Sequence, residues 1–195
     1  MAPQLIYFDI PGLAEASRQT LRAGNIEFED VRLSREDFQQ KKEAGEFPFG
    51  QLPVLVLDDG TKVSQSNAIL RWAGKQSTLY PSDSTEALRV DEVIDALDDV
   101  VGVFRSTFRI EDEAEKKAKQ EEAAAGPLIP FLKGLEALAI RNENNGHLVG
   151  SSSTIADIKL TTILSMLTGG FLPGVSTAVL EPFPALLAVK SKHEK

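Results

Sequence analysis

The chain has 195 residues and carries 21 lysines and arginines against 29 aspartates and glutamates, which gives a formal charge of −8. This length suits one large domain or two small ones, and the acidic balance argues against nucleic acid or an anionic membrane as a partner, because both select for basic surfaces. The chain contains no cysteine, which excludes disulfides, thiolate metal sites and a cysteine nucleophile.

The first eighty residues alternate between strand and helix patterns. They predict strands at 5–10, 28–33, 54–57 and 61–64, and helices at 13–23, 34–45 and 66–75. The order is therefore β-α-β-α-β-β-α. It requires a mixed sheet, because a βαβ unit makes a parallel pair of strands and a hairpin makes an antiparallel pair.

The rest of the chain reads as helical. A polar stretch from Tyr80 to Ser84 is the predicted linker, which divides the chain into an α/β domain, 1–79, and an all-helical domain, 80–195. Apolar residues at helical spacing continue as far as Phe108, and Thr154 and Asp157 form a capping-box pattern. The predicted later helices cover 111–122, 131–140, 158–167 and 184–192, with interruptions at Gly126, Pro127 and Pro130.

Three features near the strand ends suggest chemistry. Tyr7 lies within the first predicted strand, where it is either a core tyrosine or a hydroxyl donor to an anion at the end of that strand. Gln65 and Ser66 begin a helix, whose N-terminus binds anions unless Ser66 caps it. A cis bond before Pro53 would leave the main chain of Leu52 available to an extended peptide, but only about one X–Pro bond in twenty is cis.

Two further groups of residues carry side chains that could bind a cation. Asp95, Asp98 and Asp99 share one helix face by their spacing, which fits either a hard cation or a solvated acidic surface. The only two histidines, His147 and His193, are expected to be exposed. No metal site is therefore predicted, and no Gly-rich phosphate loop is present.

With these features in combination, the sequence resembles the cytosolic glutathione S-transferases. It is most similar to the sigma class, which includes the haematopoietic prostaglandin D synthases and the lens S-crystallins. The matching stretches cover nearly the whole chain. They are Leu5–Phe8, Ala14–Arg18, Phe49–Leu55, Ser64–Ile69, Val90–Val93, Leu97–Asp99 and Thr154–Asp157. The resemblance implies a thioredoxin-like N-terminal domain followed by an all-α C-terminal domain that contributes the site for an electrophile.

The resemblance also implies an enzyme that uses glutathione as a cosubstrate and holds no permanent cofactor. Tyr7 would be the catalytic residue, hydrogen-bonded to the glutathione sulfur and lowering the pKa of the thiol. The implied glutathione-binding residues are Phe38, Lys42, Gly50, Gln51, Leu52, Pro53, Gln65, Ser66 and, from the partner subunit of a homodimer, Asp99. Phe38 replaces a tryptophan usual in the sigma class.

Two departures from the family pattern bear on activity. Leu13 stands where the family generally has an arginine that supports the thiolate, and the chain ends soon after Phe183 and Pro184, where relatives continue into a further helix. The leading hypothesis is a tyrosine-type transferase that conjugates glutathione to small hydrophobic electrophiles in detoxification. The alternatives are a crystallin-like binding or structural protein with little activity and a glutathione-dependent prostaglandin-type isomerase.

The expected location is the cytoplasm. The N-terminal sequence lacks the basic and apolar regions of a secretory signal. The longest apolar runs of the whole chain, such as Val54–Leu57, are too short to span a bilayer. Neither a membrane nor a nucleic acid is therefore an expected partner.

Overall fold

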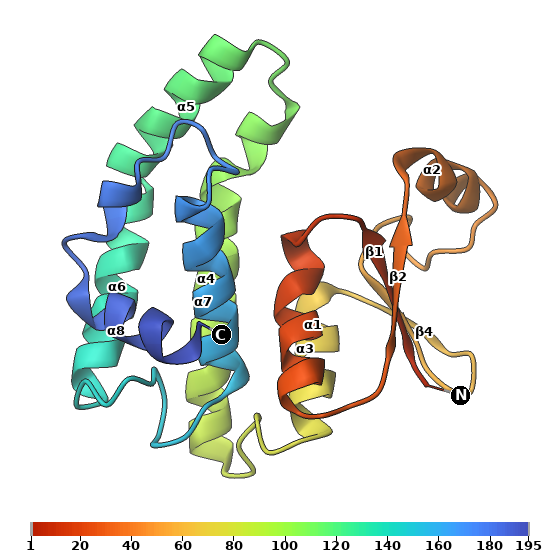
Figure 1. Cartoon of the computed structure of the whole chain (residues 1–195), viewed down its shortest axis with the longest axis horizontal. Coiled ribbons are helices and arrows are strands. Elements are labelled where there is room, and N and C mark those ends of the chain that lie inside the picture. Colours follow the sequence, from red (N-terminus) through yellow and green to blue (C-terminus); the bar gives the residue numbers. More distant parts are fainter. Residues whose placement is uncertain (1, 195) are drawn as a thin grey trace. The chain divides into compact units, whose positions relative to one another are not determined.

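The computed structural model describes residues 2–194, which form two compact units, one ending at Pro81 and the other beginning at Ser82 (Figure 1). The first unit combines four strands with three α-helices, and the second is helical. Each unit has its own core and is described separately.

The first unit follows the predicted order of strands and helices with small changes of boundary. Its elements are β1 (Gln4–Phe8), η1 (Gly12–Ala14), α1 (Glu15–Ala23), β2 (Glu29–Leu33), α2 (Arg35–Glu43), β3 (Val54–Val56), β4 (Lys62–Ser64) and α3 (Ser66–Lys75). Ser34 caps α2, since its hydroxyl accepts a hydrogen bond from the Asp37 N–H at 3.0 Å. The helix predicted to begin at Leu13 starts with a 3-10 turn before α1.

The sheet has the strand order β2-β1-β3-β4 and is mixed, as predicted. β1 pairs with β2 in parallel and with β3 in antiparallel orientation, and β3 and β4 form the hairpin. In the register, Ile6 lies opposite Val54, and Val54 lies opposite Ser64. This register determines which residues share an end of the sheet.

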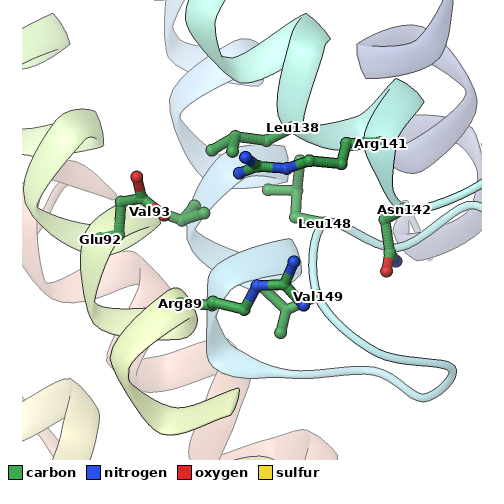
Figure 2. Close-up of a pocket in the computed structure, with 8 residues that line it drawn as sticks. All are labelled: Arg89, Glu92, Val93, Leu138, Arg141, Asn142, Leu148 and Val149. Carbon is green, nitrogen blue, oxygen red and sulfur yellow. The ribbon is translucent and has the colours of Figure 1, made fainter. Parts of the chain in front are cut away.

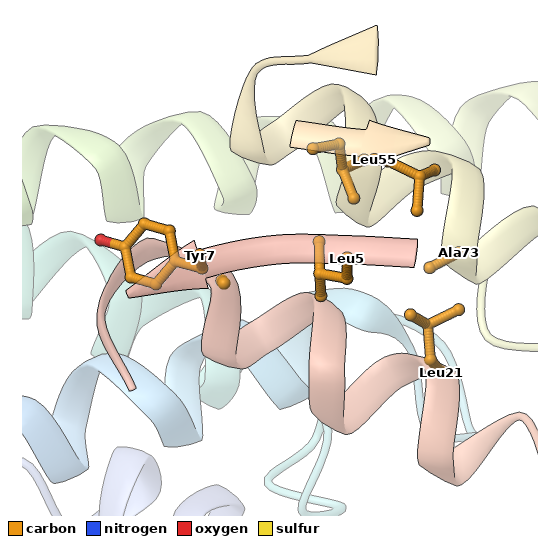
Figure 3. Packing of buried hydrophobic residues seen from close by; sticks show 7 residues of the cluster. Leu5, Tyr7, Leu21, Leu55 and Ala73 are labelled. Carbon is orange, nitrogen blue, oxygen red and sulfur yellow. The ribbon is translucent and has the colours of Figure 1, made fainter. Parts of the chain in front are cut away.

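One face of the sheet packs on helices α1 and α3. Figure 3 shows Leu5 and Tyr7 of β1 beside Leu55 of β3, with Leu21 of α1 and Ala73 of α3 in the same buried cluster. Leu5 and Tyr7 share this face because alternate residues of a strand point the same way. Tyr7 is therefore part of the core and only 7% exposed.

The second unit contains one long helix and several shorter ones. Its elements are α4 (Ser84–Phe104), η2 (Arg105–Arg109), α5 (Glu113–Ala125), α6 (Leu128–Arg141), α7 (Ile155–Thr168), η3 (Thr177–Leu180) and α8 (Pro184–His193). The predicted continuation of the first helix through Phe108 was wrong, because the chain tightens into η2 after Phe104. Pro130 was expected to interrupt a helix and does not. It lies in the first turn of α6, where a missing N–H costs no helical hydrogen bond.

Helix α7 is the buried centre of this unit and contacts both α4 and α8. The predicted capping box at its start is present: Asp157 Oδ2 accepts from the Thr154 N–H at 2.9 Å. Further along α7, the largely buried Lys159 ammonium donates to the Ile94 carbonyl and to Asp98 Oδ1. Asp98 is thus paired with a buried lysine while its own side chain stays 43% exposed, and Asp95 and Asp99 are exposed, so the three aspartates do lie on a solvated face of α4.

The expectation that both histidines are exposed was wrong. His147 is only 5% exposed and His193 is partly buried, because the loop after α6 and the end of α8 close over each other. Burial lowers the pKa of His147, although the nearby Asp157 carboxylate opposes this effect.

Across residues 2–194, no single helix has the length and apolar composition needed to cross a bilayer; only the pair α5 and α6, bent by 42° at the break between them, meets both criteria when taken together.

Candidate active site

The sheet register gathers three of the predicted features at one end of the sheet. Tyr7 follows Ile6 at the end of β1, Pro53 precedes Val54 at the start of β3, and Gln65 follows Ser64 at the end of β4. Val54 pairs with both Ile6 and Ser64 in antiparallel orientation. The residues adjoining these three, Tyr7, Pro53 and Gln65, therefore all lie at the same end of the sheet. Residues far apart in sequence therefore form one candidate site.

Tyr7 is held by the backbone of the loop that follows it. Its hydroxyl oxygen accepts a hydrogen bond from the Leu13 N–H at 3.2 Å, so the phenol's own hydrogen can be donated to a ligand. Gly12 makes room for this contact: a Cβ atom there would lie 2.6 Å from Tyr7 Oη and 2.7 Å from Cε1. Gly12 also has φ of +47°, which disfavours any residue with a Cβ.

The side chain of Arg18 holds the same loop through hydrogen bonds to its backbone carbonyls. It is fully buried, and its Nη1 donates to the carbonyls of Ile10 and Pro11 at 2.9 and 3.1 Å. Its Nε donates to Asp30 Oδ1 at 2.9 Å, and its guanidinium carbon lies 5.7 Å from the centre of the Tyr7 ring. Arg18 is therefore a positioning residue for the loop from Ile10 to Leu13.

Asp30 is the counter-charge that makes the burial of Arg18 tolerable. Its own partial burial raises the pKa of Asp30, but hydrogen bonds from Arg18 and Arg32, together with their charges, outweigh this and lower the pKa below its usual value of 3.8. The carboxylate is thus ionised at neutral pH and can balance the buried guanidinium.

The peptide bond between Leu52 and Pro53 is cis, one of the two isomers that the sequence allows. Pro53 is buried and Leu52 is half-buried immediately before β3. The backbone of Leu52 therefore lies beside the end of β1 that carries Tyr7, at a place where an extended peptide could pair with it.

Helix α3 begins at Ser66, so Ser66 is its first helical residue and does not occupy the capping position. That position belongs to Gln65, whose side chain makes no capping hydrogen bond in the described part of the chain. Gln65 has φ of +79° and ψ of 111°, an unusual conformation for a residue other than glycine. Such strain is often retained where it serves a site.

The predicted residues of α2 and the following loop also lie together. The ammonium of Lys42 is 5.8 Å from the centre of the Phe38 ring, and the side chain of Lys42 crosses Gly50, where a Cβ would lie 3.3 Å from Cε. Phe38 packs edge-on against Phe8 with ring centres 5.2 Å apart. Gln51, next to Gly50, is exposed.

The remaining predicted residue, Asp99, belongs to the second unit. It is exposed on α4, one residue after Asp98, whose carboxylate is engaged by Lys159. Its role was predicted to lie across a dimer, so it stays a prediction. Sequence reasoning missed Gly12 and Arg18 as supports for the site. A glycine after a strand and a charged residue within an apolar helix face were the signals available.

The hollows found within the second unit differ in size. The one in Figure 2, between α4, α6 and the loop after α6, has a volume of only about 10 Å³, which is room for one water molecule at most. Another has about 390 Å³, within the range of small-molecule pockets. Its walls come from the end of α4, η2, α5 and the start of α6.

Two family models match most of the chain. Residues 3–75 match the N-terminal domain of the glutathione S-transferases, and residues 98–195 match the C-terminal domain. The chain belongs to the glutathione S-transferase family. The thioredoxin-like plus all-α fold predicted from the sequence is thereby confirmed, as is its classification as a transferase enzyme.

Among its relatives, a glutathione S-transferase of Anopheles gambiae is 37% identical over 193 residues, covering 97% of this chain and 89% of the relative. The solved structure of prostaglandin synthase D from Nilaparvata lugens has a TM-score of 0.84 at 30% identity, covering 99% of this chain and 92% of that one. The monomeric glutathione S-transferase 3 of Necator americanus has a TM-score of 0.80 at 30% identity, covering 98% and 91% of the two chains.

Proposed function

We propose that this protein binds glutathione, activates its thiol as a thiolate and conjugates it to small hydrophobic electrophiles. The observation that carries the proposal is the sheet register, which gathers Tyr7, the Leu52–Pro53 segment and the start of α3 at one end of the sheet. A hydroxyl donor, a free strand-like backbone and a helix N-terminus are suited to a peptide with a thiol and carboxylates.

Tyr7 is the proposed catalytic residue. Its hydroxyl accepts from the Leu13 N–H and would donate its own hydrogen to the glutathione sulfur. Such a hydrogen bond favours the charged form of the thiol and lowers its pKa, so more thiolate is present near neutral pH. With 1-chloro-2,4-dinitrobenzene as the electrophile, a C–S bond forms, the C–Cl bond breaks, chloride leaves with the bonding electrons, and the thiol proton passes to solvent.

The other predicted residues would hold the rest of glutathione. Gln65 and Ser66 would receive the γ-glutamyl carboxylate at the N-terminus of α3, where N–H groups and the helix dipole favour an anion. Leu52, before the cis Pro53, would pair main chain to main chain with the cysteinyl unit. Lys42 and Gln51 would reach the glycyl carboxylate, beside the ring of Phe38 and the small residue Gly50.

The decisive test is Tyr7→Phe, which removes one oxygen and leaves the ring that packs in the core. We expect turnover with 1-chloro-2,4-dinitrobenzene to fall by about tenfold for each unit by which the pKa of the bound thiol rises. Glutathione affinity, measured by calorimetry, should change little. Unchanged turnover in Tyr7→Phe, or a wild-type protein that neither binds glutathione nor conjugates it, would overturn the proposal.

We also propose a homodimer in which Asp99 of the partner subunit contacts the γ-glutamyl amine. Asp99 is exposed on α4, as such a contact requires. Asp99→Asn should then weaken glutathione binding in a protein that sediments as a dimer. The Necator americanus relative is described as monomeric, so sedimentation is a necessary part of the test. A monomer with wild-type affinity in Asp99→Asn would exclude this contact.

A second candidate activity is a glutathione-dependent prostaglandin-type isomerase of the sigma class. It is favoured by the similarity to prostaglandin synthase D of Nilaparvata lugens. The test is incubation with a prostaglandin endoperoxide and glutathione, with Tyr7→Phe as the control for dependence on the thiolate. Isomerised product that is lost in Tyr7→Phe supports this activity, and its absence leaves conjugation as the function. Detoxification and a cytoplasmic location stay predictions.

A further inference from the structure

The chain's two histidines meet an aspartate at a place remote in the sequence from the candidate active site. His147 lies in the loop after α6, His193 ends α8, and Asp157 lies in the first turn of α7. His147 Nδ1 is 3.2 Å from His193 Nε2 and 3.5 Å from Asp157 Oδ2, and all three ligand atoms lie within 4.8 Å of one another. His193 Nε2 also lies 3.2 Å from the Gly146 carbonyl oxygen, and neither histidine takes part in the proposed chemistry of the active site.

These distances suit a metal ion bound between the three side chains. A tetrahedral zinc ion with bonds of about 2.0–2.1 Å places neighbouring ligand atoms about 3.3–3.4 Å apart. The two separations measured from His147 Nδ1, 3.2 and 3.5 Å, bracket that value, and His193 Nε2 and Asp157 Oδ2 lie within 4.8 Å of each other. Two imidazole nitrogens and one carboxylate oxygen form a ligand set that suits zinc better than magnesium or calcium, which prefer oxygen ligands.

The surroundings hold each ligand in place. Asp157 is fully buried; its Oδ1 accepts from the Leu148 N–H at 2.7 Å and its Oδ2 from the Thr154 N–H at 2.9 Å. Ser153 Oγ lies 3.5 Å from Nδ1 of His193, the ring nitrogen opposite the proposed ligand atom. Such outer contacts orient ligands in metal sites.

The loop that carries His147 is also fixed. The side chain of Asn142, seen beside Leu148 in Figure 2, donates to the carbonyls of His147 and Gly150 at 3.0 and 2.8 Å. His147 itself is 5% exposed. A ligand set held this firmly before the metal arrives binds with a smaller loss of conformational entropy.

We propose that His147, Asp157 and His193 form a zinc site, with water as the fourth ligand. The ion would tie the end of α8 to the loop after α6 and to the start of α7, and so would stabilise the helical unit. This inference is independent of the proposed transferase activity. Because the chain has no cysteine and no other histidine, any imidazole-dependent binding of zinc must occur here.

One neighbouring charge opposes a cation. The ammonium of Lys192 donates to the Asn145 carbonyl at 2.8 Å, and its charge acts on His147. Removing that charge in Lys192→Gln should therefore tighten zinc binding. Lys190, on the same helix, is paired with Glu194 at 2.7 Å, so Lys190→Gln is the matched control and should leave zinc affinity unchanged.

The experiment adds zinc chloride to the chelator-treated full chain and follows calorimetry and the two histidine ring signals by NMR. We expect one zinc per chain, both ring signals shifting together, and an unfolding temperature raised by about 5–10 °C at zinc concentrations a hundredfold above Kd. Cobalt in place of zinc should give the visible absorption of a tetrahedral site.

His193→Gln tests the ligand that is least buried, so the variant should fold, as circular dichroism will show. Loss of a direct ligand should weaken zinc binding by more than about 100-fold, since loss of an outer contact alone costs about 10- to 100-fold. No zinc binding by the wild-type chain, or equal binding by His193→Gln, overturns the proposal. Equal affinities for Lys192→Gln and Lys190→Gln would also contradict the placement of the ion.

Discussion

Gly12→Ala tests whether the position of the Tyr7 hydroxyl governs activity. An alanine Cβ would lie 2.6 Å from Tyr7 Oη, whereas ordinary contacts begin at 3.4 Å, so the hydroxyl or the loop must move by about 0.8 Å. A misplacement of about 1 Å at a reacting group costs on the order of 100-fold in rate. We therefore expect kcat/KM for conjugation to fall by about 10- to 100-fold.

The control for this variant is Gly60→Ala. Gly60 has φ of +84°, comparable to the +47° of Gly12, but among the described residues nothing lies within 4 Å of where its Cβ would be. Both variants should lose about 1–2 kcal/mol of folding free energy, because alanine disfavours the left-handed conformation. Only Gly12→Ala should lose activity.

The assay is steady-state conjugation of 1-chloro-2,4-dinitrobenzene at temperatures where urea unfolding shows both variants folded. Wild-type kcat/KM in Gly12→Ala would refute the assignment of Tyr7 as the group that activates the thiol, and so would an equal loss of activity in Gly60→Ala.

Three further predictions concern the support of this site. Arg18→Leu removes the hydrogen bonds to the Ile10 and Pro11 carbonyls, while Asp30 keeps Arg32, and should lower the free energy of unfolding by about 1–3 kcal/mol in urea titrations. Arg22→Leu removes an exposed arginine of the same helix and should change it little. Because its folded-state pKa is lowered from 3.8, Asp30 adds stability above that pH that is lost as the pH falls through the folded pKa; Asp30→Asn should therefore flatten the fall in the urea midpoint below about pH 4. Leu13→Arg should lower the pKa of bound glutathione by up to about one unit, seen as thiolate absorbance, and Leu13→Met should not.

Most of the first unit could be predicted from the sequence because its signals are local. Alternating apolar residues indicate the strands, and Ser34 at the start of α2 is a capping residue whose partner lies three positions away. The mixed sheet followed from the order of elements alone. The helix from Ser66 to Lys75 was predicted with its exact bounds, but its cap was not, since the backbone conformation of Gln65 leaves no local pattern.

What could not be predicted depends on contacts between distant residues. His147 and His193 were expected on the surface because polar residues in a loop and a tail usually are, and their pairing spans 46 positions. The same holds for Lys159 and Asp98, which are 61 positions apart. Arg18 looked like one polar residue of a helix, and only the fold shows that carbonyls and Asp30 surround it.

The hydrogen bond from the Leu13 N–H to Tyr7 has a consequence for how this family can diverge. Every amino acid except proline supplies a backbone N–H, so the contact persists whichever side chain evolution places at position 13. Exchange of an arginine for leucine at that position therefore removes a charge and leaves the orientation of the phenol intact. Under the proposed mechanism, drift at this position would adjust how strongly the thiol is activated, and only a proline there would remove the hydrogen bond itself.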